Sequence, residues 1–217
     1  MMKKNGFTLA EVLITLAIIG VVASLTLPSL MTNTQEQQSV TAFKKAMNTL
    51  NEVAQMNAAI DGFDYSGIAN TNAPTARAVY DANGALEQSI WGMMASKAQV
   101  DVPQSTTGGI AGGCNGMSQV FFRDGTVLCY AATATNGNNS SFINAVVDTN
   151  GRKAPNALSS CSDANCAVAA NKVIRDQYNI VLRGGNALPG RITVDANGTV
   201  TEVASSENNA ARWAMRK

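Results

Sequence analysis

Residues 6–27 read GFTLAEVLITLAIIGVVASLTL, and this stretch decides how the chain begins to fold. Between Phe7 and Leu27 the only charged residue is Glu11. At a rise of 1.5 Å per residue, a helix of this length spans roughly 30 Å, the thickness of the hydrocarbon core of a bilayer. The stretch therefore predicts a helix of membrane-spanning length.

The carboxylate of Glu11 is unexpected in a helix that serves only as an anchor. On insertion scales a carboxylate at depth in lipid costs about 2.5–3.5 kcal/mol. An opposite charge on another molecule would offset that cost. Lys3 and Lys4 precede the helix, which favours a cytoplasmic N-terminus and an exported remainder.

An ordinary secretory signal peptide, cut after Val22-Ala23-Ser24, is one alternative, and a plain signal anchor is another. The length of the apolar run, the charge inside it and the Gly-Phe-Thr-Leu sequence at its start argue against both.

The segment resembles the class III signal and N-terminal helix of type IV pilins and type II secretion pseudopilins. That resemblance implies cleavage after Gly6 by a prepilin peptidase and N-methylation of Phe7. It implies that Glu11 pairs with the N-terminal amine of a neighbouring subunit. Gly20 and Pro28 stand where family members carry a Gly and a Pro that loosen the helix. The implied partners are other pilin or pseudopilin subunits, the prepilin peptidase and an inner-membrane assembly platform.

A second helical pattern follows Pro28. Its apolar residues recur at helical spacing on one face, and these are Val40, Phe43, Met47, Leu50 and Ala54. The opposite face carries Gln38, Lys45, Asn48 and Glu52. We expect one helix from about residue 7 to 59, ended by Asp61-Gly62, apolar all round in its first half and amphipathic in its second. Pro28 is expected to kink or loosen it.

The rest of the chain predicts loops, two short helices and strands. The loops are 62–75 and 104–113, and the helices are 85–97 and 164–173. The strands are 117–122, 126–130, 142–147, 178–182, 191–194 and 199–203, of which the first two and the last two form hairpins. The tail after Ser205 shows only weak patterning. The fold class is α+β and pilin-like: a long N-terminal helix packed on a C-terminal antiparallel sheet.

We expect four parts along the chain: a leader peptide (1–6), an apolar assembly helix (7–28), its amphipathic continuation (29–61) and an exported globular domain (62–217).

The four cysteines of that domain are expected to form disulfides, because the predicted topology places them outside the cytoplasm. Pairing Cys114 with Cys129 and Cys161 with Cys166 closes two short loops and is favoured, although crosslinks between the two regions remain open.

The composition excludes several kinds of site. The chain has no histidine, which excludes Ser-His-Asp catalysis and His-ligated zinc. Its formal charge is +1, and only 14% of its residues are charged, so a strongly basic nucleic-acid surface is not expected.

Two D-x-N-G segments are the candidates for metal binding. Asp148 with Asn150, and Asp195 with Asn197, offer oxygens at a spacing that calcium uses, but the rest of an EF-hand loop is missing. Asn-Gly is also a common turn, so turns are favoured, no cofactor is expected and calcium stays open. Residues 148–156, followed by Asp176-Gln177-Tyr178, resemble a loop of some pseudopilin-like sequences, with Ala154 where a Gly is frequent.

These features predict a non-enzymatic structural subunit, a minor pilin or pseudopilin of a type IV pilus or type II secretion system. It would be a single-pass inner-membrane protein with its C-terminal domain in the periplasm. A competence pilin that binds DNA and a membrane-anchored extracytoplasmic ligand-binding domain are the alternatives.

Overall fold

The computed structural model describes residues 6–68, 80, 83–101, 110–130, 142–163, 166, 172–194 and 199–217. The chain divides into two units, residues 1–38 and 39–217. Helix α1 (Leu9–Ile60) contributes to both, and Pro28 lies inside it. The single long helix expected from the sequence is therefore confirmed. Asp61 follows the helix, and Gly62 takes a positive φ of 78°, which ends the helical run.

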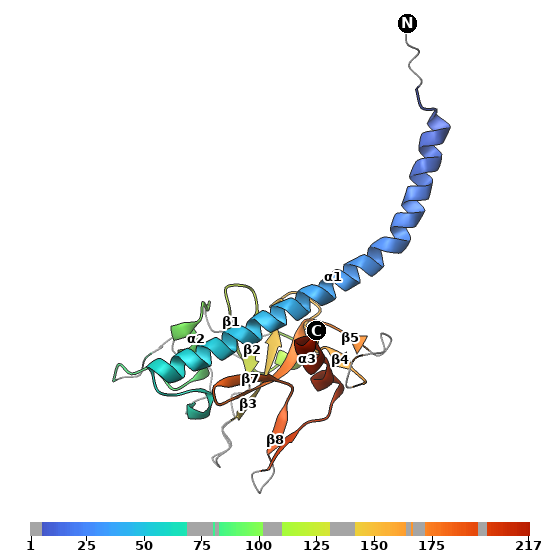
Figure 1. The fold of residues 1–217 in the computed structure, drawn as a ribbon. Coiled ribbons are helices and arrows are strands. Elements are labelled where there is room, and N and C mark those ends of the chain that lie inside the picture. The colour runs from blue at the N-terminus through green and yellow to red at the C-terminus, as the bar shows by residue number, and fades with distance from the viewer. Residues whose placement is uncertain are drawn as a thin grey trace. The chain divides into compact units, whose positions relative to one another are not determined.

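The second unit is built on a five-stranded antiparallel sheet (Figure 1). Its strand order is β1-β2-β3-β6-β7. The strands are β1 (Ser118–Phe121), β2 (Val127–Tyr130), β3 (Phe142–Asp148), β6 (Gln177–Arg183) and β7 (Asn186–Pro189). The hairpin predicted at its start is confirmed, with Ser118 opposite Tyr130. Together with α1, this sheet confirms the α+β, pilin-like fold class.

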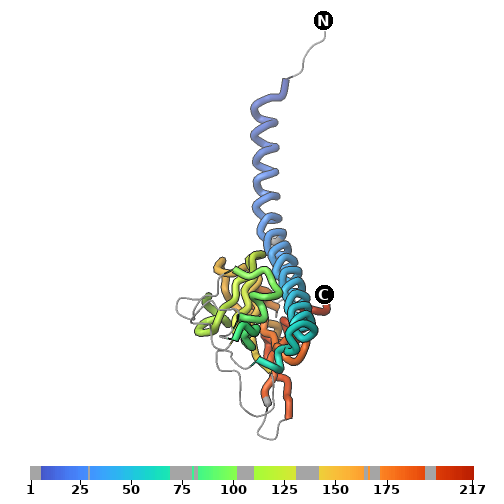
Figure 2. The backbone as a smooth tube through the Cα atoms, turned by 90° about the vertical axis from the view of Figure 1, so that its left-hand side faces the viewer, coloured from blue at the N-terminus to red at the C-terminus, as the bar shows by residue number. Residues whose placement is uncertain are grey.

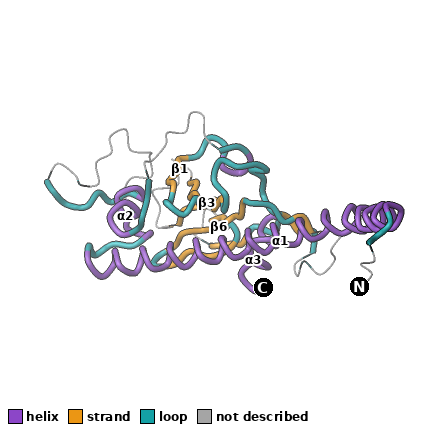
Figure 3. The backbone as a smooth tube through the Cα atoms, turned by 90° about the horizontal axis from the view of Figure 1, so that it is seen from above, coloured by secondary structure: helices purple, strands orange, loops and turns teal. Residues whose placement is uncertain are grey.

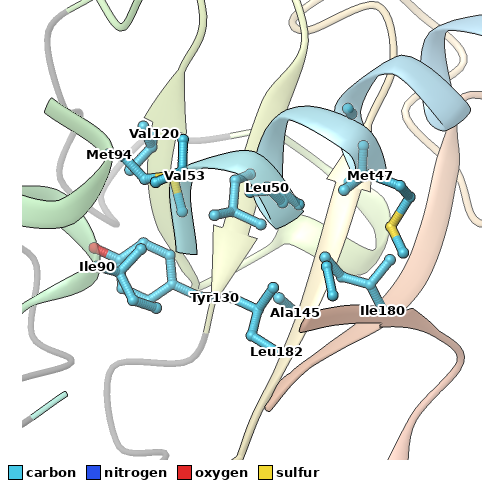
Figure 4. Close-up of a cluster of buried hydrophobic side chains, with 14 of the residues drawn as sticks. Met47, Leu50, Val53, Ile90, Met94, Val120, Tyr130, Ala145, Ile180 and Leu182 are labelled. Carbon is cyan, nitrogen blue, oxygen red and sulfur yellow. The ribbon is translucent and has the colours of Figure 1, made fainter. Parts of the chain in front are cut away.

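The C-terminal half of α1 runs along the sheet unit, as the cyan segment of the tube in Figure 2 shows. All five apolar residues predicted to form its inner face are buried. The ring of Phe43 stacks on that of Tyr178 with centroids 4.4 Å apart. Figure 4 shows Met47, Leu50 and Val53 pointing at side chains from the sheet and from α2 (Ile90–Lys97). The apolar face of α1 is thus part of the domain core.

Helix α2 is shorter than the helix expected over residues 85–97. Ser89 accepts a hydrogen bond from the backbone N–H of Gly92 at 2.9 Å and so starts the helix at Ile90. Leu86 instead forms a β-bridge with Tyr80. Viewed from above, α2 lies beside the C-terminal end of α1 (Figure 3).

The C-terminal residues form helix α3 (Ser206–Arg216), which was not expected. Ser205 caps it by accepting from the N–H of Asn208. The residues that it buries are small or polar, namely Asn208, Ala210, Ala211 and Ala214. The ring of Trp213 packs at the core, with the amines of Lys172 and Lys217 lying 4.5 and 4.9 Å from its centroid.

Two small sheets complete the unit. Strands β8 (Ile192–Val194) and β9 (Val200–Glu202) pair as predicted, while the D-x-N-G turn between them lies outside the described residues. Strand β4 (Ser160–Cys161) pairs with β5 (Lys172–Val173). The expected helix 164–173 is therefore wrong at its C-terminal end, because residues 172–173 hydrogen-bond to another strand. Most of its remaining residues lie outside the described part.

The predicted loops contain one-turn 3-10 helices at Tyr65–Gly67 and Gly112–Cys114. The rest of 62–75 and 104–113 falls largely outside the described residues.

The disulfides follow the favoured pairing. Cys114 is bonded to Cys129, and Cys161 to Cys166, each with a Cα–Cα distance of 5.4 Å. The first ties the 3-10 turn before β1 to strand β2, and the second closes the loop beside β4. Cys161, Cys166 and Ala210 of α3 share a small core cluster.

Two turns of the sheet unit touch through glycine. A Cβ at Gly151, whose φ is +70°, would lie 2.8 Å from the carbonyl oxygen of Gly125. At Gly116, with φ +73°, a Cβ would meet nothing within 4 Å.

We expect Gly116→Ala to lower the free energy of unfolding by about 1–2 kcal/mol, which is the cost of a left-handed residue, and Gly151→Ala to lower it by more. Denaturant unfolding of both full-length variants in detergent tests this, and equal losses would contradict it.

Candidate functional site

The first turn of α1 is closed by a reciprocal pair of side chains. Oε2 of Glu11 accepts hydrogen bonds from the backbone N–H and the hydroxyl of Thr8, both at 2.8 Å. In return the N–H of Glu11 donates to Oγ1 of Thr8 at 3.3 Å. This is the capping-box arrangement, with Thr8 at the cap and Glu11 three residues later. It fixes where the helix begins.

The other carboxylate oxygen of Glu11 is left available. Oε1 accepts no hydrogen bond from any residue that the structure describes. A carboxylate can accept at both oxygens at once. A donor from another molecule can therefore reach Glu11 without displacing its own cap.

The helix that follows is apolar on every side. Its large side chains are exposed in the chain by itself, among them Leu9, Leu13, Ile14, Leu16, Ile18, Ile19, Val21, Leu25 and Leu30. By length and composition, α1 is the one helix in the described part that could cross a membrane. Exposed apolar surface of this extent is stable only where lipid or other apolar helices cover it.

Several hydroxyls in this segment are satisfied within the helix. Those of Thr15, Ser24 and Thr26 each donate to a carbonyl three or four residues earlier, at 2.8–3.0 Å. Thr32 donates in the same way to the carbonyl of Pro28 at 3.0 Å. These groups therefore need no water and no partner, which suits an apolar environment.

Gly20 and Pro28 are both inside α1. A Cβ at Gly20 would meet no atom within 4 Å, so packing within this chain does not require glycine there. Pro28 has no N–H and cannot donate to the carbonyl of Ser24, four residues earlier. That the two residues loosen the helix for assembly stays a prediction.

Comparison with known proteins identifies this N-terminal segment. Residues 1–27 match the prokaryotic N-terminal methylation motif. The motif is the signature of type IV pilins and pseudopilins, and it implies processing by a prepilin peptidase and assembly with other pilin subunits. With the apolar helix, it also indicates membrane anchoring.

The match covers the N-terminal segment alone. No curated protein and no solved structure matches the chain. The matched motif does not extend into the sheet unit.

The candidate calcium ligand Asp148 is buried at the end of β3 and already has three hydrogen-bond donors. Oδ1 accepts from the backbone N–H groups of Asn150 and Gly151 at 3.1 and 2.8 Å. Oδ2 accepts from Nε2 of Gln177 at 2.8 Å. These bonds are those of a turn, and calcium would have to displace them. No group of three or more acidic, cysteine or histidine side chains that could hold a metal ion occurs in the described part of the chain, and calcium binding at Asp148 and Asn150 stays a prediction.

Gln177 and Asp176 join the loop 148–157 to the sheet. The amide of Gln177 accepts from the N–H of Gly113 and donates to the carbonyl of Ala111. The carboxylate of Asp176 accepts from the N–H groups of Asn156 and Ala157 at 2.7 and 2.9 Å. The two segments that the sequence resemblance had associated, 148–156 and 176–178, are therefore in contact. Their hydrogen bonding could not be predicted, because the partners are far apart in sequence.

The pKa of Asp148 predicts a pH-dependent stability. Burial raises that pKa to about 6, while the bonds from Gln177 and Asn150 act against the rise. Since the folded chain then binds this proton more tightly than the unfolded chain, the free energy of unfolding falls as pH rises from about 4 through 6, by about 2–3 kcal/mol. Asp148→Asn is expected to remove this part of the pH dependence.

Denaturant unfolding of the full chain in detergent from pH 4 to 7 measures the effect. The exposed carboxylate variant Asp101→Asn serves as the control. Because Asp124 and Glu207 have lowered pKa values and contribute the opposite slope, only the difference between wild type and variant is informative. The same pH slope in wild type and Asp148→Asn would contradict the assignment.

Proposed function

We propose that this chain is a structural subunit, a minor pilin or pseudopilin, of a type IV pilus or a type II secretion pseudopilus. The observation that carries the proposal is the form of α1. Its first part bears the methylation motif and an uncovered apolar surface, and its second part supplies one wall of the domain core. Packing of many such helices side by side would bury the uncovered surface and display the sheet units outside.

In this proposal the leader, residues 1–6, is removed and Phe7 becomes the methylated N-terminus. Lys3 and Lys4 hold the leader in the cytoplasm, so the sheet unit faces the periplasm. The role is structural and not enzymatic, with the prepilin peptidase and an inner-membrane assembly platform as the partners that process and insert the subunit.

In this proposal Glu11 sets the axial register between neighbouring subunits. Its Oε2 stays with Thr8, and its free Oε1 accepts from the Phe7 amine of a neighbouring subunit. A charge pair in an apolar bundle is costly to break, because the remaining partner is left buried and unpaired. The pair therefore selects one axial position for each added subunit.

Processing is tested by mass spectrometry of the purified protein. We expect a mature chain that starts at Phe7 and carries one added methyl group there. Gly6→Ala is expected to leave the leader uncut, because the peptidase reads the glycine before the cut. Gly20→Ala, another glycine whose added Cβ meets nothing in this chain, should be processed normally. A mature N-terminus at Leu25 would instead establish an ordinary signal peptide.

Assembly is tested by charge removal at Glu11. In cells that lack other copies of the subunit, we expect Glu11→Ala to reduce recovery in sheared filaments or crosslinked pseudopili at least about tenfold, since a stranded amine costs several kcal/mol. Glu52→Ala removes an exposed carboxylate from the same helix and should assemble normally. Equal recovery of wild type and Glu11→Ala, with both correctly processed, would show that Glu11 does not serve assembly.

A further inference from the structure

The sheet unit has a hollow of about 560 Å³ between two of its turns. One turn follows β1 and carries Arg123. The other follows β3 and carries Arg152 and Lys153. Phe121 and Phe122 are also among the lining residues. The size is within the usual range of sites for small ligands.

The two turns are packed directly against each other. Gly151 approaches the carbonyl of Gly125 so closely that no side chain fits between them. Asp148 fixes the second turn through the N–H groups of Asn150 and Gly151. In the first turn, Asp124 accepts from the N–H and hydroxyl of Thr126 at 3.0 and 2.7 Å. The cations at the hollow are therefore carried on backbone that is already ordered.

Positive charge dominates this hollow. Arg123, Arg152 and Lys153 are all exposed and, among the described residues, none has an ion-pair partner. Asp124, which follows Arg123 in the sequence, pairs with Lys45 of α1 at 2.8 Å. Asp101 is the one carboxylate in the lining, so two positive charges remain in excess.

The guanidinium of Arg152 is preorganised for ligand binding. Its central carbon lies 5.2 Å from the centroid of the Phe121 ring. An arginine on an aromatic ring gives up little side-chain freedom on binding and keeps its N–H edges available for an oxyanion.

From these contacts we propose that the hollow binds a phosphate monoester on a small, sugar-sized body. A phosphate monoester carries between one and a half and two negative charges at neutral pH, and it has three acceptor oxygens, which matches an excess of two positive charges and two arginine forks. The hollow is larger than a phosphate and leaves room for the attached group. This site is independent of the proposed assembly through α1.

The aromatic residues argue against a nucleic acid as the ligand. Proteins that hold single strands stack bases on open aromatic faces. Here one face of Phe121 lies under Arg152, and Phe122 is only 8% exposed. The site therefore offers charge recognition without a stacking platform.

The experiment is calorimetric titration of the full-length protein in a non-ionic detergent at low salt. Glucose 6-phosphate is the probe, and inorganic phosphate, citrate and phosphatidic acid vesicles are separate arms. We expect saturable binding of glucose 6-phosphate that the double variant Arg123→Gln/Arg152→Gln weakens at least about tenfold. Arg183→Gln, at the exposed end of β6, should change it less than about twofold.

A second measurement locates the site without depending on heat signals. Phenylglyoxal modifies accessible arginines, and peptide mass spectrometry reports each one. Glucose 6-phosphate should protect Arg123 and Arg152 but not Arg183. If the double variant unfolds at the same temperature as the wild type, a folding defect is excluded. We expect this result because both side chains are exposed.

Four results would overturn the proposal: no saturable binding, equal protection of all three arginines, tighter binding of citrate than of the phosphate ester, or an equal loss in Arg183→Gln. Inorganic phosphate binding as tightly as the ester would overturn the part that assigns a sugar-sized body. Binding of the vesicles in preference to the soluble ester would identify a lipid head group as the source and overturn the soluble ligand.

Discussion

The sheet unit depends on one interaction, the burial of one face of α1 against it. Phe43 stacks on Tyr178, and the hydroxyl of Tyr65 donates to the carbonyl of Leu50 at 2.7 Å. Burial raises the pKa of Tyr65, so this phenol stays protonated and keeps donating. The amide of Asn51 accepts from the N–H of Ala187 in β7 at 2.6 Å. Helix and sheet thus share both an apolar core and specific polar bonds, which makes the helix inseparable from the domain that it carries.

The long helix was predictable because its signals are local. The apolar run and the residues at helical spacing after it both lie within one continuous segment, so no distant contact had to be known. The same holds for the hairpin at β1 and β2, whose turn is marked by Asp124-Gly125. Short disulfide loops were predictable for a related reason, since closing them needs only neighbours in sequence.

Elements that depend on distant partners were missed. Helix α3 is amphipathic but weakly hydrophobic, because it buries alanines and an asparagine where a surface helix usually buries large apolar residues. Strand β7 is short and ends at Pro189, a residue tolerated only at a sheet edge, where β7 lies. Residues 172–173 pair with β4 because β4 is adjacent in space. For β7 and for residues 172–173, tertiary contacts outweighed local propensity.

The candidate sites also differ in whether their contacts are local or join residues that are far apart in the sequence. The cap formed by Thr8 and Glu11 was not predicted, although its signal is local, because a capping box spans only four residues. The bond between Asp148 and Gln177 joins residues 29 apart, and the hollow at Arg123 and Arg152 joins two turns brought together by strand pairing. A sequence shows which residues could take part in such sites, but only the fold shows which of them meet.

The polar groups in the apolar part of α1 are of two kinds, hydroxyls that are hydrogen-bonded within the helix and the carboxylate of Glu11. The hydroxyls of Thr15, Ser24 and Thr26 donate to carbonyls of their own helix, so they leave no unpaired donor. Glu11 is different. Its Oε2 accepts the hydrogen bonds that cap the helix, and its Oε1 accepts none from the described part of the chain. A group left unsatisfied in lipid is unfavourable by itself and becomes stable only when a donor arrives from outside. The same carboxylate can therefore start the helix of its own chain and still accept a donor from another molecule.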